Sequence, residues 1–377
     1  MNGSRSGTGV AIDEEIEGLI ETLVRKGGSD LHLACANPPV FRIHGELRRV
    51  PEHPDALTAE RIATMIASLV EPDQFAALER EGELDCAFQF RDGNRLRINS
   101  YRQQGELAAA IRLLPNRFFS LEQLGLSVNL LHDICRLHAG LVLVTGATSS
   151  GKSTTIASIV NEINKARAVH IHTIEDPVEY RHESNKSYVT QREVGRDTAS
   201  FAEALRRSMR QDPDVIVVGE MRDLETMSSA LTLSETGHLT FATLHTSDAA
   251  QTVSRIISSF PAAQQSQVRV QLASTLQAVI SQKLVPWKDG KGRSLAAEIL
   301  VATPAVKAMI RDEKTHQIKT AMQTGIDKGM RTLNQSLVRL VREGLISMDT
   351  AVQYSEEKEN IKEDMGLVHV ERDRSDL

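Results

Sequence analysis

The sequence predicts an α/β protein with two domains: a small mixed domain, then a larger one with a mainly parallel sheet and a helical C-terminal region. The chain has 377 residues, which is too long for one ordinary hydrophobic core. Its first part places strand candidates next to one another with turn signals between them. Its second part alternates short apolar strands with helical stretches, the pattern of a parallel sheet with helices on both faces.

The first domain is expected over residues 12–114, after a flexible Gly/Ser-rich tail at residues 1–11. Apolar residues at helical spacing predict a helix that begins near Ile12, and a second helix is expected over about 58–80. The strand candidates of this domain are SDLHLA, VFRIHGELRRV, ELDCAFQF, NRLRINSYRQ and LAAAIRLLP. Together these elements predict a small mixed α/β fold.

The second domain is expected over residues 137–355, after a linker at residues 115–136. Its strand candidates are GLVLVTG, AVHIHTIED, VIVVGE and LTFATLH, and its helices are expected at 152–165, 223–235 and 248–258. Beyond about residue 263 the pattern is helical, with a single strand candidate in RSLAAEIL. Residues 356–377 form a charge-rich tail for which partial disorder is expected.

Composition argues against several classes of protein. The net charge of −6 and pI near 6.1 do not suit a dedicated nucleic-acid binder. No apolar run is long enough to span a bilayer, so direct membrane insertion is not expected. Cys35, Cys86 and Cys135 have no CxxC spacing and are expected to be reduced thiols rather than zinc ligands.

A phosphate-binding loop is predicted where an apolar strand meets a helix. The stretch Gly146–Ser153 matches G-x-x-x-x-G-K-[ST] in that context. Its two glycines let the backbone curl so that successive N–H groups face a phosphate, and the helix N-terminus adds positive potential. Lys152 would reach the β- and γ-phosphates, and the Ser153 hydroxyl would ligate Mg²⁺. The predicted nucleotide-binding residues are Gly146, Ala147, Thr148, Ser149, Ser150, Gly151, Lys152, Ser153 and Thr154.

Carboxylates follow two further strand candidates. Glu175, Asp176 and Glu179 come at the end of HIHTIEDPVEY, where Pro177 redirects the chain. A carboxylate held near the γ-phosphate can orient and deprotonate the attacking water. Glu220 ends VIVVGE, and three roles are open to it. The favoured role is to hold magnesium through water, before that of general base and that of a solvated residue at a strand end.

Histidines and arginines are further candidates. His238 and His245 flank the strand candidate LTFATLH, and each is a candidate sensor of the γ-phosphate. Arginines on adjacent strand candidates of the first domain offer planar charged groups suited to phosphate. They are Arg95, Arg97, Arg102 and Arg112, and solvated strand faces are an equally open interpretation for each.

Taken together, these stretches resemble the type IV pilus retraction ATPases of the secretion ATPase superfamily. The resemblance covers nearly the whole chain. The motifs that carry it are GGSDLHLA, GATSSGKSTT as Walker A, TIEDPVEY as the Asp box, GEMRD as the Walker B motif and TGHLTFATLHT as the His box.

This resemblance implies a PAS-like N-terminal domain, a RecA-like P-loop ATPase domain and a homohexamer that uses ATP and Mg²⁺. It implies that Glu179 is the catalytic glutamate, Glu220 the Walker B glutamate, and Glu175 a supporting group together with Asp176. His238 and His245 fill the His box, and Arg97 and Arg112 match the arginines that reach nucleotide from the N-terminal domain. The implied partners are an inner-membrane platform protein and a paralogous retraction ATPase, with the chain in the cytoplasm at the membrane's inner face.

The direction of the motor is less sharply indicated. The chain lacks the tetracysteine insert usual in extension ATPases, which favours retraction. Residues 305–312, AVKAMIRD, stand where retraction ATPases typically have AIRNLIRE, and keep only Ala305, Ile310 and Arg311. An accessory retraction motor and an assembly ATPase therefore stay open as alternatives. A nucleic-acid translocase and a silent ring member are further alternatives, disfavoured by the acidic composition and by the presence of both Glu179 and Glu220.

Overall fold

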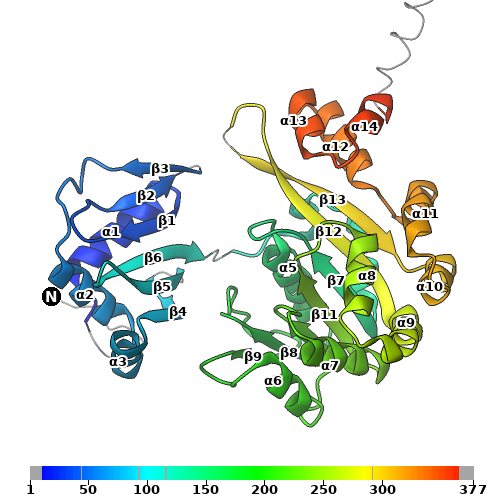
Figure 1. Ribbon diagram of the computed structural model, residues 1–377, viewed down its shortest axis with the longest axis horizontal. Coiled ribbons are helices and arrows are strands. Elements are labelled where there is room, and N and C mark those ends of the chain that lie inside the picture. The colour runs from blue at the N-terminus through cyan, green and yellow to red at the C-terminus, as the bar shows by residue number, and fades with distance from the viewer. Residues whose placement is uncertain (1–10, 44, 92–93, 115–116, 291, 365–377) are drawn as a thin grey trace, which may run out of the picture. The chain divides into compact units, whose positions relative to one another are not determined.

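The computed structural model describes residues 11–43, 45–91, 94–114, 117–290 and 292–364 (Figure 1). The predicted tail at residues 1–11 therefore lies almost wholly outside the described residues, as does most of the charged tail. Two compact units make up the chain. The first comprises residues 1–117 with 177–181, and the second comprises residues 118–176 with 182–377.

The first unit is a six-stranded antiparallel sheet in the order β3-β2-β1-β6-β5-β4, with three helices. Its elements are α1 (Glu14–Arg25), β1 (Gly28–Leu33), β2 (Val40–Ile43), β3 (Glu46–Arg49), α2 (Ala59–Leu69), α3 (Pro72–Glu81), β4 (Glu83–Gln89), β5 (Arg95–Gln103) and β6 (Glu106–Leu114). The Asp13 side chain accepts from the N–H groups of Glu15 and Ile16 and so caps α1. The apolar face of α1 is buried in the core of this unit.

Two segments of the first unit differ from the expected pattern. The helix expected over about 58–80 is two helices, because Pro72 begins α3 and Val70 before it is extended. The expected strand VFRIHGELRRV is the hairpin β2–β3, in which Ile43 pairs with Glu46. In both cases the predicted segment has the predicted type of secondary structure, but it is divided into two elements.

The second unit contains a seven-stranded sheet in the order β13-β12-β7-β11-β10-β8-β9. Neighbouring strands from β12 to β9 are parallel, and β13 alone is antiparallel to β12. The strands are β7 (Gly140–Thr145), β8 (His170–Glu175), β9 (Tyr188–Glu193), β10 (Val215–Val218), β11 (Leu239–Leu244), β12 (Leu276–Pro286) and β13 (Arg293–Val301). The predicted α/β class with a mainly parallel sheet is confirmed.

Helices cover both faces of this sheet (Figure 1). On one face α4 (Val128–Arg136) and α5 (Lys152–Ala166) pack against the strands. On the other face lie α6 (Phe201–Ser208), α7 (Leu224–Glu235), α8 (Ala249–Ser258) and α9 (Ala262–Thr275). The C-terminal helices are α10 (Pro304–Arg311), α11 (Ile318–Thr324), α12 (Leu333–Arg342), α13 (Met348–Tyr354) and α14 (Lys358–Asp364). The apolar side chains of β7, β10 and β11 are accordingly buried on both sides.

The expectation of a purely helical region with one strand beyond residue 263 is wrong. β12 begins at Leu276, runs for 11 residues and joins the sheet between β7 and β13. β9 was also not predicted, and α14 lies inside the stretch expected to be a partly disordered tail. Among the residues that the structure describes, no helix is long and apolar enough to cross a membrane.

Two histidines, buried His172 and half-buried His182, make the stability of the fold sensitive to acid. Burial, with the charges of His170 and Arg192, lowers the pKa of His172 to about 4, and burial lowers the pKa of His182 to about 4. An unfolded histidine takes up its proton near pH 6.5, so between pH 6.5 and 4 the unfolded chain binds more protons than the folded one. Stability is therefore present above pH 6.5 and lost as the pH falls towards 4.

We expect the free energy of unfolding to fall by about 2 kcal/mol between pH 7 and 5 on account of His172 alone, measured by urea unfolding at each pH. His172→Gln should remove that part of the slope, whereas His316→Gln, a change at an exposed site, should leave it. Equal slopes in the wild type and the His172 variant would contradict the assignment.

Candidate active site

The loop between β7 and α5 has the curled backbone that phosphate binding requires. Its φ angles are positive at Gly146 (+136°), Ser149 (+64°) and Gly151 (+93°). A Cβ at Gly146 would lie 2.4 Å from the backbone oxygen of Gln282 and 2.7 Å from Ser150 Oγ, so no other residue fits there without displacement. The loop therefore has the tight shape in which N–H groups converge on an anion.

Lys152 and Ser153 open α5 directly after this loop. Lys152 is buried, with 9% of the residue exposed, and its ammonium donates to the backbone oxygens of Gly146 (2.8 Å) and Ala147 (2.9 Å). A lysine held over the loop in this way is positioned to exchange carbonyl oxygens for phosphate oxygens. Ser153 is half-buried in the first turn of the helix. The residues present thus fit a nucleotide phosphate with its Mg²⁺.

The carboxyl ends of β7, β11, β10 and β8 meet at one edge of the sheet, because these neighbouring strands are parallel. Glu220 follows β10 and His245 follows β11, so that His245 stands between the loop strand and the Glu220 strand. The structure therefore brings together the loop, Glu220 and His245 from stretches far apart in the sequence.

Glu220 is held by two side chains. His245 Nε2 lies 3.2 Å from its Oε1, and Arg222 Nη2 lies 2.8 Å from its Oε2. Partial burial raises the pKa of Glu220, but the hydrogen bond from Arg222 and the charges of His245 and Arg222 outweigh burial and leave that pKa below its usual value. Glu220 is thus an ionised group at neutral pH.

Glu175 and Asp176 end β8 at the same edge. Thr173 Oγ1 donates to Glu175 Oε1 at 2.6 Å, and Gln191 Nε2 donates to the same oxygen at 3.2 Å. Asp176 is exposed. Gly219 makes room for this strand end, since a Cβ there would lie 3.2 Å from Glu175 Cα.

Glu179 belongs to the segment 177–181, which groups with the first unit. Within that unit, Arg95 Nη1 donates to the backbone oxygen of Val178 at 2.5 Å. Arg97 is paired with Asp85 (Nη2 to Oδ2, 2.5 Å), and Arg112 with Asp30 (Nε to Oδ1, 2.7 Å). The roles of Glu179, Arg97 and Arg112 towards nucleotide stay predictions.

His238 is not brought to this edge within the second unit. It precedes β11, and its backbone oxygen accepts from the N–H of Gly140 at the start of β7. Its Nδ1 is 3.0 Å from the backbone oxygen of Leu233. The length of β11, about 20 Å at 3.3 Å per residue, separates it from His245. Of the two candidate γ-phosphate sensors, His245 alone stands beside Glu220.

Sequence reasoning missed three residues that shape the site. Arg222 holds Glu220, and Thr243 Oγ1 donates to the backbone oxygen of Gly219 just before it. Gln282, on the unpredicted strand β12, lies against the loop. The arginine of GEMRD was visible beside Glu220, whereas Thr243 and Gln282 carry no motif signal.

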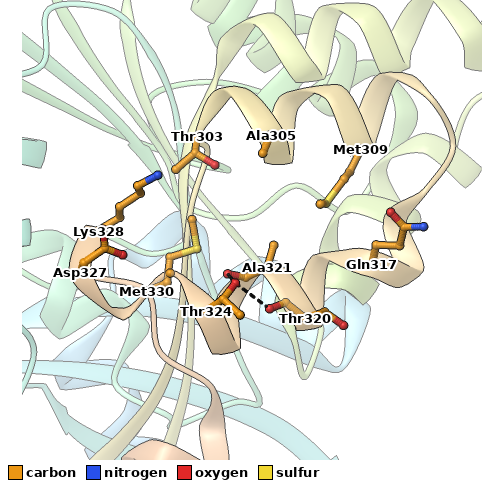
Figure 2. A pocket seen from close by; sticks show the side chains of 11 residues that line it. Thr303, Ala305, Met309, Gln317, Thr320, Ala321, Thr324, Asp327, Lys328 and Met330 are labelled. Atoms are coloured by element: carbon orange, nitrogen blue, oxygen red, sulfur yellow. Dashed lines mark hydrogen bonds between the residues drawn. The ribbon is translucent and has the colours of Figure 1, made fainter.

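A cavity of about 390 Å³ lies between α10 and α11, and none of its lining residues belongs to these motifs. Figure 2 shows Ala305 and Met309 from α10 above Ala321 and Thr324 from α11. The cavity adjoins residues 305–312, where the chain departs from the retraction ATPase pattern. It is not part of the candidate active site.

Comparisons with known proteins show which family the chain belongs to. The family model described as "Type II/IV secretion system protein" matches residues 8–353. The type IV pilus retraction ATPase PilT of Pseudomonas aeruginosa is 43% identical over 346 residues, which cover 92% of this chain and 99% of that protein. The type IV pilus ATPase PilU of the same organism is 36% identical over 348 residues, covering 92% and 90%. The crystal structure of the pilus retraction motor PilT with bound ADP superposes with a TM-score of 0.85 at 43% identity, over 92% of this chain and 99% of that one.

Gly146→Ala tests the tight packing of the loop. We expect it to lower the free energy of unfolding by about 1–3 kcal/mol more than Gly237→Ala does, because a methyl group at Gly146 meets backbone that cannot yield. Gly237 is the matched control, since its φ is also positive (+103°) but a Cβ there meets nothing within 4 Å. Equal losses for the two variants, measured by thermal and urea unfolding, would show that backbone strain alone is at work.

Proposed function

Because the chain belongs to the type II/IV secretion system protein family, whose members include ATPases, we propose that it hydrolyses ATP to ADP and phosphate to power retraction of a type IV pilus. The observation that carries the proposal is the phosphate-binding loop at the same sheet edge as the Glu220–His245 pair. A loop alone would support nucleotide binding. An ionised carboxylate beside it supports hydrolysis.

In this proposal the loop N–H groups and Lys152 bind the β- and γ-phosphates. Ser153 would ligate Mg²⁺ and Glu220 would hold the ion through water. When bound, this ion neutralises charge that develops on the phosphate oxygens. The lowered pKa of Glu220 favours that role over the role of general base, because a carboxylate that keeps its negative charge is a weak proton acceptor.

The general base is then assigned to Glu179, as the family resemblance implies, with Glu175 and Asp176 as supporting groups. Glu179 takes the proton of the attacking water as that water adds to the γ-phosphorus and ADP leaves. His245, oriented by Glu220, contacts the γ-phosphate and distinguishes ATP from ADP. Arg97 and Arg112 contribute positive charge from the first unit.

The proposed working form is a homohexamer in the cytoplasm, bound to the inner face of the cell membrane through a pilus platform protein. Closing of the N-terminal domain over ATP and its opening after hydrolysis would be the power stroke. The similarity to PilT supports this assignment, and the resemblance to PilU supports a paralogous ATPase as a further partner.

A second candidate function is that of an accessory retraction motor. It is favoured by α10, where Lys307 stands in place of the arginine of the retraction pattern. Lysine lacks the planar fork of arginine, and here its Nζ donates to the backbone oxygen of Ser274 at 3.2 Å. An assembly ATPase is the third candidate.

Glu179→Gln tests the assigned base. It should lower kcat for ATP hydrolysis by about a hundredfold or more and leave the ADP dissociation constant unchanged, because an amide cannot accept the proton. Glu183→Gln, an exposed change in the same stretch, is the matched control and should hydrolyse at the wild-type rate.

Lys152→Ala should lose both binding and hydrolysis. A Lys152→Ala variant that hydrolyses ATP at the wild-type rate would refute the loop assignment.

Deletion of the chain in its own host separates the candidate functions. A retraction motor predicts cells with excess surface pili and no twitching, because pili assemble but are not withdrawn. An accessory motor predicts partial twitching that a paralogous ATPase sustains. Bald cells would point to assembly and contradict retraction. Pilus counts by electron microscopy and twitching zones on agar are the two measurements.

A further inference from the structure

Gln282 lies at the base of the phosphate-binding loop, although it belongs to β12, far along the chain. Its side chain is 1% exposed. Its Nε2 donates to Thr155 Oγ1 at 2.7 Å, in the first turn of α5. Its backbone oxygen is the atom that a Cβ at Gly146 would meet at 2.4 Å. One residue therefore contacts both the beginning of the loop and the helix that follows it.

The neighbouring residue fixes β12 in register with the loop strand. Ser281 pairs with Thr145, the last residue of β7, and their hydroxyl groups are 2.8 Å apart. Ser281 Oγ and Thr145 Oγ1 are both buried. The backbone that carries Gln282 is thus tied to the residue that immediately precedes Gly146.

Two buried polar atoms at this place are left without hydrogen bonds. Gln282 Oε1 and Ser150 Oγ have no partner among the described residues. Both border the loop glycines: Ser150 Oγ is 2.7 Å from a Cβ built at Gly146, and Gln282 Oε1 is 4.0 Å from one built at Gly151. One atom can only accept a hydrogen bond and the other can donate one, so the two are complementary.

We propose that Gln282 is a positioning residue of the phosphate-binding loop, and that Ser150 donates its hydroxyl hydrogen to Gln282 Oε1 when the loop holds a phosphate. This inference rests on the proposed nucleotide binding. Gln282 holds α5 through Nε2 and the loop through Oε1, so that the loop N–H groups and Lys152 face the same phosphate. Buried polar atoms rarely stay unpaired, which favours a bond between these two complementary atoms beside the loop.

The chemistry of the side chain explains why a glutamine serves here. Glutamate would lack the Nε2 donor to Thr155 and would bury a charge. Leucine has a similar size but neither polar atom. Asparagine has both atoms on a side chain shorter by one methylene group. The three substitutions therefore separate charge, hydrogen bonding and reach.

The experiment is a double-mutant cycle on the affinity of the full-length protein for Mg-ADP, measured by calorimetric titration. Ser150→Ala should weaken ADP binding about tenfold, which corresponds to the loss of one buried hydrogen bond, and Gln282→Leu should weaken it further, because it also removes the bond from Nε2 to Thr155. The double variant should bind ADP no more weakly than Gln282→Leu alone, because the bond that Ser150→Ala removes is already lost. Losses of the two single variants that multiply in the double variant would overturn the pairing of Ser150 with Gln282.

A merely structural role for Gln282 would give a different readout. It would lower the number of binding sites per chain and the melting temperature, while the sites that remain would keep the wild-type dissociation constant. That result would overturn the positioning role. Should Gln282→Leu fail to fold, Thr155→Val removes the other end of the Nε2 bond with little change of shape. It should weaken ADP binding several-fold, and unchanged binding would count against the proposal.

Gln277→Leu is the matched control. Gln277 lies on the same strand but beside Gly140, at the start of β7, and should leave ADP affinity unchanged. The wild type is measured first, so that two failures can be told apart. Wild-type protein that binds no ADP contradicts the proposed function. If the wild type and Gln282→Leu bind ADP equally tightly, only the role of Gln282 is contradicted.

Discussion

The arrangement of the candidate site depends on one constraint, the strand order β7-β11-β10-β8 with all these strands parallel. Buried parallel strands end at a common edge, and whatever follows each strand is delivered there. β11 lies between β7 and β10, so His245 reaches Glu220 at 3.2 Å from the strand next to the loop. If β11 occupied another position in the sheet, His245 would end beside a different strand and could not contact Glu220.

Charge at this edge is balanced locally. Glu220 is partly buried, which alone would favour its neutral form, and Arg222 restores the ionised form through a direct hydrogen bond. The guanidinium is two residues away on the same backbone segment, and Thr243 of the adjacent strand holds that segment at Gly219. Thr243 thus fixes the backbone just before Glu220, whereas Arg222 stabilises the charge of the Glu220 carboxylate.

Much of this was predictable from local patterns. Each of these features is encoded by one continuous stretch of sequence: the loop motif, each apolar strand, and Glu220 at the end of its strand. A continuous motif can be recognised together with the strand and helix that flank it. β12 was missed because both of its faces are largely buried and polar residues (Ser281, Gln282 and Lys283) interrupt its apolar ones, so it shows neither the alternation nor the apolar run of a typical strand. The contact of Gln282 with the loop depends on that strand's place beside β7, which no local pattern encodes. His238 and His245 flank β11, as the sequence predicted, and the strand between them leaves only His245 beside Glu220.

β12 also joins two regions of the second unit. Lys283, directly after Gln282, pairs with Glu356 at 2.7 Å, and Glu356 lies between α13 and α14. Successive residues of one rigid strand therefore touch the loop on one face of the sheet and the last helices on the other. The same strand thus links the phosphate-binding loop to the last helices of the chain through side-chain contacts only one residue apart.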